Sequence, residues 1–88
     1  MRDMREDVFA QVFELGSIQS VQLVIINANA RIAYTCLDSS TGVIHTKRGA
    51  VKEYRIETAL RFLRHLGVND VHVDMTGWEP YQDLLPLS

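Results

Sequence analysis

The chain has 88 residues, an apolar fraction of 47% and a formal net charge of −2. That length fits one domain, and that apolar fraction is far above the range of disordered chains. No apolar run approaches the ~18 residues of a membrane-spanning helix, and the opening stretch MRDMREDVF has acids where a secretory signal has apolar residues. Cys36 is the single cysteine, so no internal disulfide can form. A small cytoplasmic domain is therefore expected.

The first predicted element is a helix over residues 4–15. Asp3, followed by Glu6, resembles a capping box at its start. The spacing of its apolar residues is helical, and Gly16 with Ser17 ends it. The residues that share its apolar face are Met4, Val8, Val12 and Leu15, widened by Phe9 and Phe13.

Strands are predicted next at residues 21–26, 31–38 and 43–48, with a short edge strand at 51–54. The first is apolar on both sides of the pleat, with Val24 and Ile26 on its second side. A strand of this kind is covered on both faces, either within its domain or by a second subunit. Turns are predicted at 27–30 and 39–42, which are rich in Asn, Ser and Gly.

A helix and a strand complete the predicted fold. Residues 56–66 have helical spacing, with the apolar sector Ile56, Ala59, Leu60, Phe62, Leu63 and Leu66. Gly67 permits a left-handed stop, and Val71, Val73 and Met75 then alternate with polar residues as in a strand. The order α-β-β-β-(β)-α-β predicts an α+β domain over residues 1–76. It has a small, mostly antiparallel sheet with the second helix on one face and the first on the same or the opposite face.

Residues 77–88 are predicted to form an apolar C-terminal arm. Pro80 and Pro86 exclude a long helix there. The arm either folds back over the sheet or docks on another chain. Its apolar residues are Trp78, Tyr81, Leu84, Leu85 and Leu87.

The charges are sorted along the chain. Residues 47–64 carry six basic groups against two acids, a balance of +4, whereas residues 65–88 carry four acids and no Lys or Arg. Clustered cations can bind phosphates, and the candidate nucleic-acid-binding residues are Lys47, Arg48, Lys52, Arg61 and Arg64. The alternative is a solvated helix face with a Glu57–Arg61 pair. The pI of about 5.8 is far below that of dedicated nucleic-acid-binding domains.

Side chains with catalytic or metal-binding chemistry are few. His45, His65 and His72 lack the short-range pairing of zinc sites, so neither a metal nor a cofactor is expected. His72 and Asp74 share one strand face, and Cys36 alternates with apolar residues as a packed core residue does. An enzyme using Cys36 or His72 with Asp74 is only a remote alternative, and no catalytic residue is assigned.

A family resemblance covers about the C-terminal half of the chain. It rests on T-K-R-G at 46–49, K-E-Y-R at 52–55, E-T-A-L-R-F-L at 57–63, L-G-V at 66–68, V-H-V-D at 71–74 and G-W-E-P at 77–80. These segments resemble short accessory proteins of bacterial plasmids and integrated mobile elements, some of them partition-associated. The resemblance implies a bacterial setting and a maintenance or regulatory role, and it carries over no catalytic residue.

The expected function is that of a non-enzymatic interaction or regulatory protein that acts as a homo-oligomer. The amount of apolar surface predicts a homodimer. The sequence does not identify a further protein partner. Nucleic-acid binding through the basic segment 47–64 is the alternative. The expected interface residues are Val24, Ile26, Trp78, Tyr81, Leu84 and Leu85.

Overall fold

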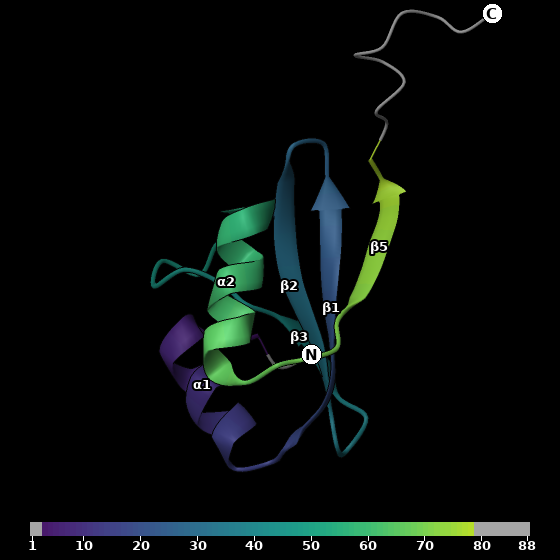
Figure 1. The fold of residues 1–88 in the computed structure, drawn as a ribbon. Helices are drawn as coiled ribbons and strands as arrows, with labels where there is room; N and C mark the ends of the chain where they lie inside the picture. The colour runs from purple at the N-terminus through teal and green to yellow at the C-terminus, as the bar shows by residue number, and fades with distance from the viewer. Residues whose placement is uncertain (1–2, 79–88) are drawn as a thin grey trace, which may run out of the picture.

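The computed structural model describes residues 3–78, which form a two-layer α+β domain (Figure 1). Its elements are α1 (Glu6–Glu14), β1 (Ile18–Ile26), β2 (Asn29–Cys36), β3 (Thr41–Val43), β4 (Tyr54–Arg55), α2 (Ile56–Leu66) and β5 (His72–Gly77). The strand order is β3-β2-β1-β5, and β4 pairs with β2. All these pairs are antiparallel except β1–β5. The predicted fold class is therefore confirmed.

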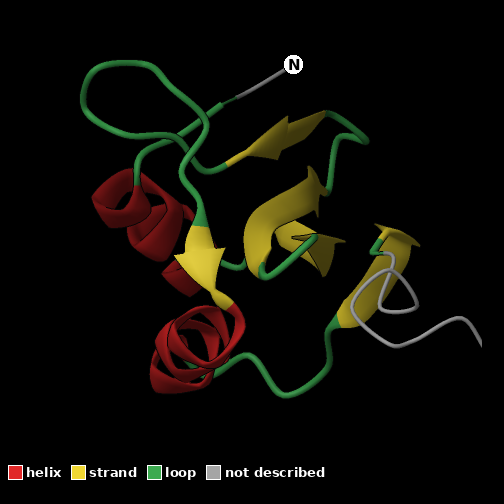
Figure 2. Cartoon of the chain, turned by 90° about the horizontal axis from the view of Figure 1, so that it is seen from above, coloured by secondary structure: helices red, strands yellow, loops and turns green. Residues whose placement is uncertain are grey.

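Both helices lie on the same face of the sheet (Figure 2). The core fills the space between these layers. Phe9 of α1 is fully buried, and its ring centroid lies 5.2 Å from that of Tyr34 in β2 and 6.5 Å from that of Phe62 in α2. Leu63 of α2 is also buried. The largest fully buried side chains of the described chain are Tyr34, Phe9, Leu23, Ile32, Ile44 and Leu63, with Cys36.

The prediction for α2 is confirmed at both ends. The helix runs from Ile56 to Leu66, and Gly67 follows it with a φ of 102°. A side chain is strained at that φ, so glycine is the suitable residue for the stop. Leu60 differs from the prediction, because its side chain is 44% exposed. The helix packs through Ala59 and Leu63, which leaves Leu60 on the flank of the apolar sector.

The predicted start of α1 is wrong. The helix begins at Glu6, and its N-cap Arg5 makes no side-chain capping hydrogen bond. Asp3 instead accepts a hydrogen bond at Oδ1 from the Val43 N–H, 3.1 Å away. Met4 forms a parallel bridge with Ile44. Residues 3–5 are therefore extended along the end of β3, and they cannot form the first turn of the helix.

The predicted ranges of the third and fourth strands are wrong. β3 shares only Val43 with the predicted strand 43–48 and includes Thr41 and Gly42, which were predicted as a turn. β4 shares only Tyr54 with the predicted strand 51–54. The chain turns at Thr46–Ala50, where the Thr46 N–H donates to the Ala50 carbonyl over 2.7 Å and Gly49 has a φ of 87°. That turn ends the strand predicted to reach residue 48. Val51 makes only an isolated bridge to His45, and β4 consists of Tyr54 and Arg55. In the described part of the chain, no helix is long and apolar enough to cross a membrane.

Candidate interaction surfaces

The first candidate surface is the face of the sheet that the helices leave open. Val24 and Ile26 of β1 lie on this face and are half-buried. They alternate with the buried residues Leu23 and Ile25, which face the helices. No described element covers this face (Figure 2). The structure thus places two of the predicted interface residues on an uncovered surface.

The second candidate surface is the outer edge of β5. This strand pairs with β1 on one side only, at the end of the strand order, and no strand of residues 3–78 pairs with its other side. An unpaired edge presents backbone N–H and C=O groups in a row, which can pair with a strand of another chain. Natural edges are commonly blocked by lysine or proline. Neither occurs in the sequence of β5, HVDMTG, and the register shift of β5 against β1 lies in its second half, after Asp74, so the regular edge is that of His72–Asp74.

Exposed apolar side chains accompany this edge. Val73 lies opposite Leu23 of β1, so it points to the helix side of the sheet. The helix layer does not extend over β5 (Figure 2), and Val73 is 42% exposed, Met75 54% and Trp78 42%. On β5, Val73 is therefore an exposed apolar side chain on the helix side of the sheet without a covering helix, and Met75 and Trp78 are exposed farther along the same segment.

The exposed flank of α2 borders the same region. The Phe62 ring stacks with that of Tyr54 in β4 and lies beside Phe9 of α1, so Phe62 marks the flank toward α1. Leu60 precedes Phe62 by two residues, which places it on the flank away from α1 because each helical residue turns ~100°. β5 lies beyond that flank in Figure 2. Leu60 therefore adds an apolar side chain on the β5 side of the helix layer.

His72 and Asp74 lie on the helix-free face of β5. Their register partners in β1 are Gln22 and Val24. The Thr76 N–H donates to Asp74 Oδ1 over 3.0 Å, and Thr76, with a smaller effect of His72, holds the pKa of Asp74 below its ordinary value. The carboxylate is therefore negative over the physiological range. The edge strand displays an imidazole and a carboxylate two residues apart.

The opposite end of the sheet is better protected. β3 has three residues and β4 has two. Met4 pairs with Ile44 just after β3, and the His45 N–H donates to the Met4 carbonyl over 2.9 Å. Very short or covered edge strands are poor templates for pairing. The two edges of the sheet therefore differ, and β5 is the one open to another strand.

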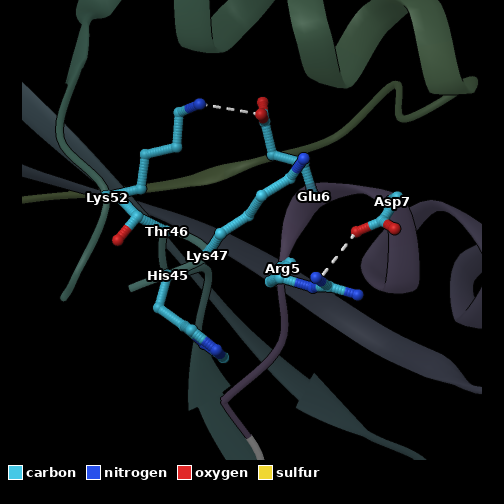
Figure 3. A pocket seen from close by; sticks show the side chains of 7 residues that line it. All are labelled: Arg5, Glu6, Asp7, His45, Thr46, Lys47 and Lys52. Atoms are coloured by element: carbon cyan, nitrogen blue, oxygen red, sulfur yellow. Dashed lines mark hydrogen bonds and ion pairs between the residues drawn. The ribbon is translucent and has the colours of Figure 1, made fainter. Parts of the chain in front are cut away.

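A pocket of about 440 Å³ lies between the start of α1 and the segment around His45 (Figure 3). Two ion pairs occur among its lining residues: Lys52 Nζ to Glu6 Oε1 at 2.8 Å joins its two sides, and Arg5 Nε to Asp7 Oδ1 at 3.6 Å lies at the start of α1. These pairs compensate most of the charge in the pocket. Its lining residues are Arg5, Glu6, Asp7, His45, Thr46, Lys47 and Lys52.

The five predicted phosphate-binding residues do not form one free cluster. Lys52 pairs with Glu6, Arg61 donates to Glu57 over 2.6 Å, and Arg64 donates to the Asn69 side chain over 2.7 Å. Lys47 and Arg48 lie on the exposed turn at 46–50, where no hydrogen bond or ion pair of their side chains occurs among the described residues. The Glu57–Arg61 pair of the alternative interpretation is present.

The two candidate sites of the remote enzyme alternative lie on different strands, Cys36 on β2 and His72 with Asp74 on β5. Cys36 is 2% exposed and belongs to the core, as its alternation with apolar residues predicted. Over residues 3–78, no group of three or more His, Cys, Asp and Glu side chains is arranged to hold a metal ion.

Two outcomes remain for the predicted interface. Trp78 is exposed, whereas Tyr81, Leu84 and Leu85 lie outside the described residues, so the arm stays a prediction. The residues at the β5 edge, Val73 and Met75, were predicted as a strand and not as an interface. The sequence signal for an unprotected edge at β5 was the absence of Lys and Arg after Arg64.

Comparison with protein-family models, with curated proteins and with solved structures found no match to this chain.

Proposed function

We propose that this protein is a non-enzymatic interaction or regulatory protein that acts as a homo-oligomer. The observation that carries the proposal is the open edge of β5 with its exposed apolar residues, Val73 and Met75. Contiguous exposed apolar surface marks interaction sites, and an unblocked strand edge adds backbone groups that need partners. The half-buried Val24 and Ile26 on the helix-free face support the same class of function.

The setting we propose is the maintenance or regulation of a bacterial plasmid or other mobile element. Its support is the resemblance of residues 45–80 to short accessory proteins of such elements. A role as a scaffold or regulator requires a surface for partners, which the two uncovered parts of the sheet supply. It requires no catalytic group.

Self-association is tested by sedimentation of the purified chain from low to high micromolar concentration. The expected result is a mass above the 10.0 kDa of the single chain, with the fraction of the larger species rising with concentration. A single species of chain mass at every concentration would contradict the proposal. The same samples run at high salt separate apolar association, which persists, from charge-driven association, which weakens.

A second candidate function is nucleic-acid binding. The observation that favours it is the exposed turn at residues 46–50, where Lys47 and Arg48 have no ion-pair partner among the described residues. Three other cations of the segment are accompanied by acceptors, Lys52 by Glu6, Arg61 by Glu57 and Arg64 by the Asn69 side chain. Carboxylates beside a cation reduce its attraction for phosphate, so this function ranks second.

A further inference from the structure

We infer that two copies of this chain pair through β5, antiparallel, about a twofold axis at Val73. The inference rests on the proposed self-association and names the surface and register that produce it. Its basis is the sequence Val71-His72-Val73-Asp74-Met75, which is chemically symmetric about its centre. In a twofold interface the same patch occurs on both subunits, so it must be complementary to itself.

The geometry of a sheet limits the possible registers. A twofold axis perpendicular to the sheet keeps the helices of both copies on the same side. Residues that face each other across antiparallel strands point to the same side of the sheet, and neighbouring residues alternate. The axis must therefore pass through a residue. β5 pairs with β1 in regular register from His72 to Asp74, before the register shifts between Asp74 and Gly77, so the choices in the regular part of the strand are His72, Val73 and Asp74.

Charge selects among these three registers. An axis at Asp74 places that carboxylate directly against its own copy. An axis at His72 places Asp70 against the partner's Asp74. Like charges directly opposite on adjacent strands are destabilising. An axis at Val73 places His72 opposite the partner's Asp74 and, by symmetry, Asp74 opposite the partner's His72, so two imidazole–carboxylate pairs form.

The apolar residues agree with the same register. With the axis at Val73, that residue faces the partner's Val73, and Met75 faces the partner's Val71. The pair at Val73 lies on the helix side, because Val73 is opposite the buried Leu23 in β1. The pairs of His72 with the partner's Asp74 lie on the helix-free side. The result is one continuous sheet with its exposed apolar strand moved from the edge to the centre.

The first test of this interface introduces a positive charge at the twofold axis. Val73→Lys opposes two lysines across the axis and should raise the dimer Kd at least about tenfold, measured by sedimentation. Val51→Lys is the matched control, since Val51 is 41% exposed against 42% for Val73 and lies away from β5. Circular dichroism spectra of both variants check that the fold is retained.

Exchange of the charged pair tests the register. His72→Asp sets two carboxylates against each other, and Asp74→Lys sets a lysine against the imidazole, so each should weaken the dimer roughly 3- to 30-fold. The double variant H72D/D74K restores opposite charges and should recover the wild-type Kd within a few-fold. Single variants that weaken the dimer without recovery in the double variant would overturn the register at Val73.

A disulfide provides a direct distance measurement. With the axis at Val73, Val73→Cys places two thiols on facing residues whose Cα atoms are ~5 Å apart, within the range of a disulfide. Mild oxidation should then give a covalent dimer. Met75→Cys is the control, since its two copies are four residues apart along the strand, or roughly 13 Å. Cys36 is buried and does not compete. Equal cross-linking of the two variants would overturn the register.

The outcomes separate this inference from the proposed function. A wild-type chain that stays monomeric defeats both. The wild-type dimer could instead persist in Val73→Lys and dissociate in Val24→Lys, a change on the helix-free face. That result would support self-association but would contradict pairing through β5. Loss of the dimer in Val73→Lys, with Val51→Lys unaffected and recovery in the charge exchange, supports the inference.

Discussion

Glu6 connects two parts of the chain that are distant in sequence. Its carboxylate accepts a hydrogen bond from Lys52 Nζ at 2.8 Å and one from the Tyr54 hydroxyl at 2.9 Å, across 46 and 48 residues respectively. Lys52 Nζ also lies 5.3 Å from the centre of the Tyr54 ring. These contacts tie the first turn of α1 to the segment that leads into α2.

Tyr54→Phe tests this connection through the dependence of stability on pH. Burial first, and then the hydrogen bond and negative charge of Glu6, raise the pKa of Tyr54 far above its ordinary value of 10.0. Above pH ~10 the unfolded chain releases this proton and the folded chain keeps it, so the free energy of unfolding decreases as pH rises. Below that pH the contribution is fully present.

The expected result has two parts. At pH 7, Tyr54→Phe should lower the free energy of unfolding by about 1 kcal/mol through the lost hydrogen bond. Above pH 10, the wild type should lose up to ~1.4 kcal/mol per pH unit more than the variant. Urea unfolding followed by circular dichroism between neutral and alkaline pH measures both. Parallel pH profiles for the two proteins would show that Tyr54 does not retain its proton in the folded chain.

At the scale of elements, α2 is anchored by one face and solvated on the other. Leu63 is 1% exposed in the core, whereas the neighbouring Arg64 is exposed and its guanidinium donates to the Asn69 side chain. Leu63→Ala should lower the free energy of unfolding by about 2–5 kcal/mol. Arg64→Ala should lower it by about 0.5 kcal/mol or less. Thermal melts of the two variants measure the difference, and equal melting temperatures would contradict the orientation of the helix.

The contrast between α2 and α1 indicates what a sequence can predict here. The ends of α2 depend on local signals, namely the spacing of its apolar residues and Gly67, and both were predicted. The start of α1 depends on Asp3 bonding Val43, 40 residues away, and on Glu6 bonding Lys52. Sequence spacing cannot report such partners, so a local capping box was predicted in their place.

The candidate site was predictable in part for the same reason. The alternation of Val71, Val73 and Met75 identified a strand. Its position at the edge of the sheet depends on the topology: β5 follows both helices in the chain and pairs with β1 in parallel, outside the β1–β2 hairpin. The predicted interface therefore included Val24 and Ile26, because the apolar residues on both sides of β1 are visible in its own sequence. It did not include Val73, because the edge position of β5 is not.

At the scale of the whole molecule, the distribution of charge decides between the two candidate functions. Five cations on phosphate contacts would give a log–log salt slope near −4.5, at about −0.9 per phosphate neutralised. The structure pairs Lys52 with Glu6 and Arg61 with Glu57. Those carboxylates would approach the same phosphates and repel them. Lys47 and Arg48 alone would give a slope of about −1.8.

We therefore expect no measurable binding of the wild-type chain to random duplex DNA at ~50 mM salt, where non-specific affinity is strong. Fluorescence anisotropy over a salt series is the measurement. The matched variants are K47A/R48A, on the exposed turn, and R61A/R64A, on the exposed face of α2. Both pairs of substitutions remove two positive charges from solvated positions, so the fold should be retained.

Tight binding with a salt slope near −4.5, reduced by either pair of substitutions, would instead make the basic segment a nucleic-acid surface and overturn the ranking of the two functions. Weak binding lost only in K47A/R48A would confine phosphate contact to the turn, because the cations of α2 then contribute nothing.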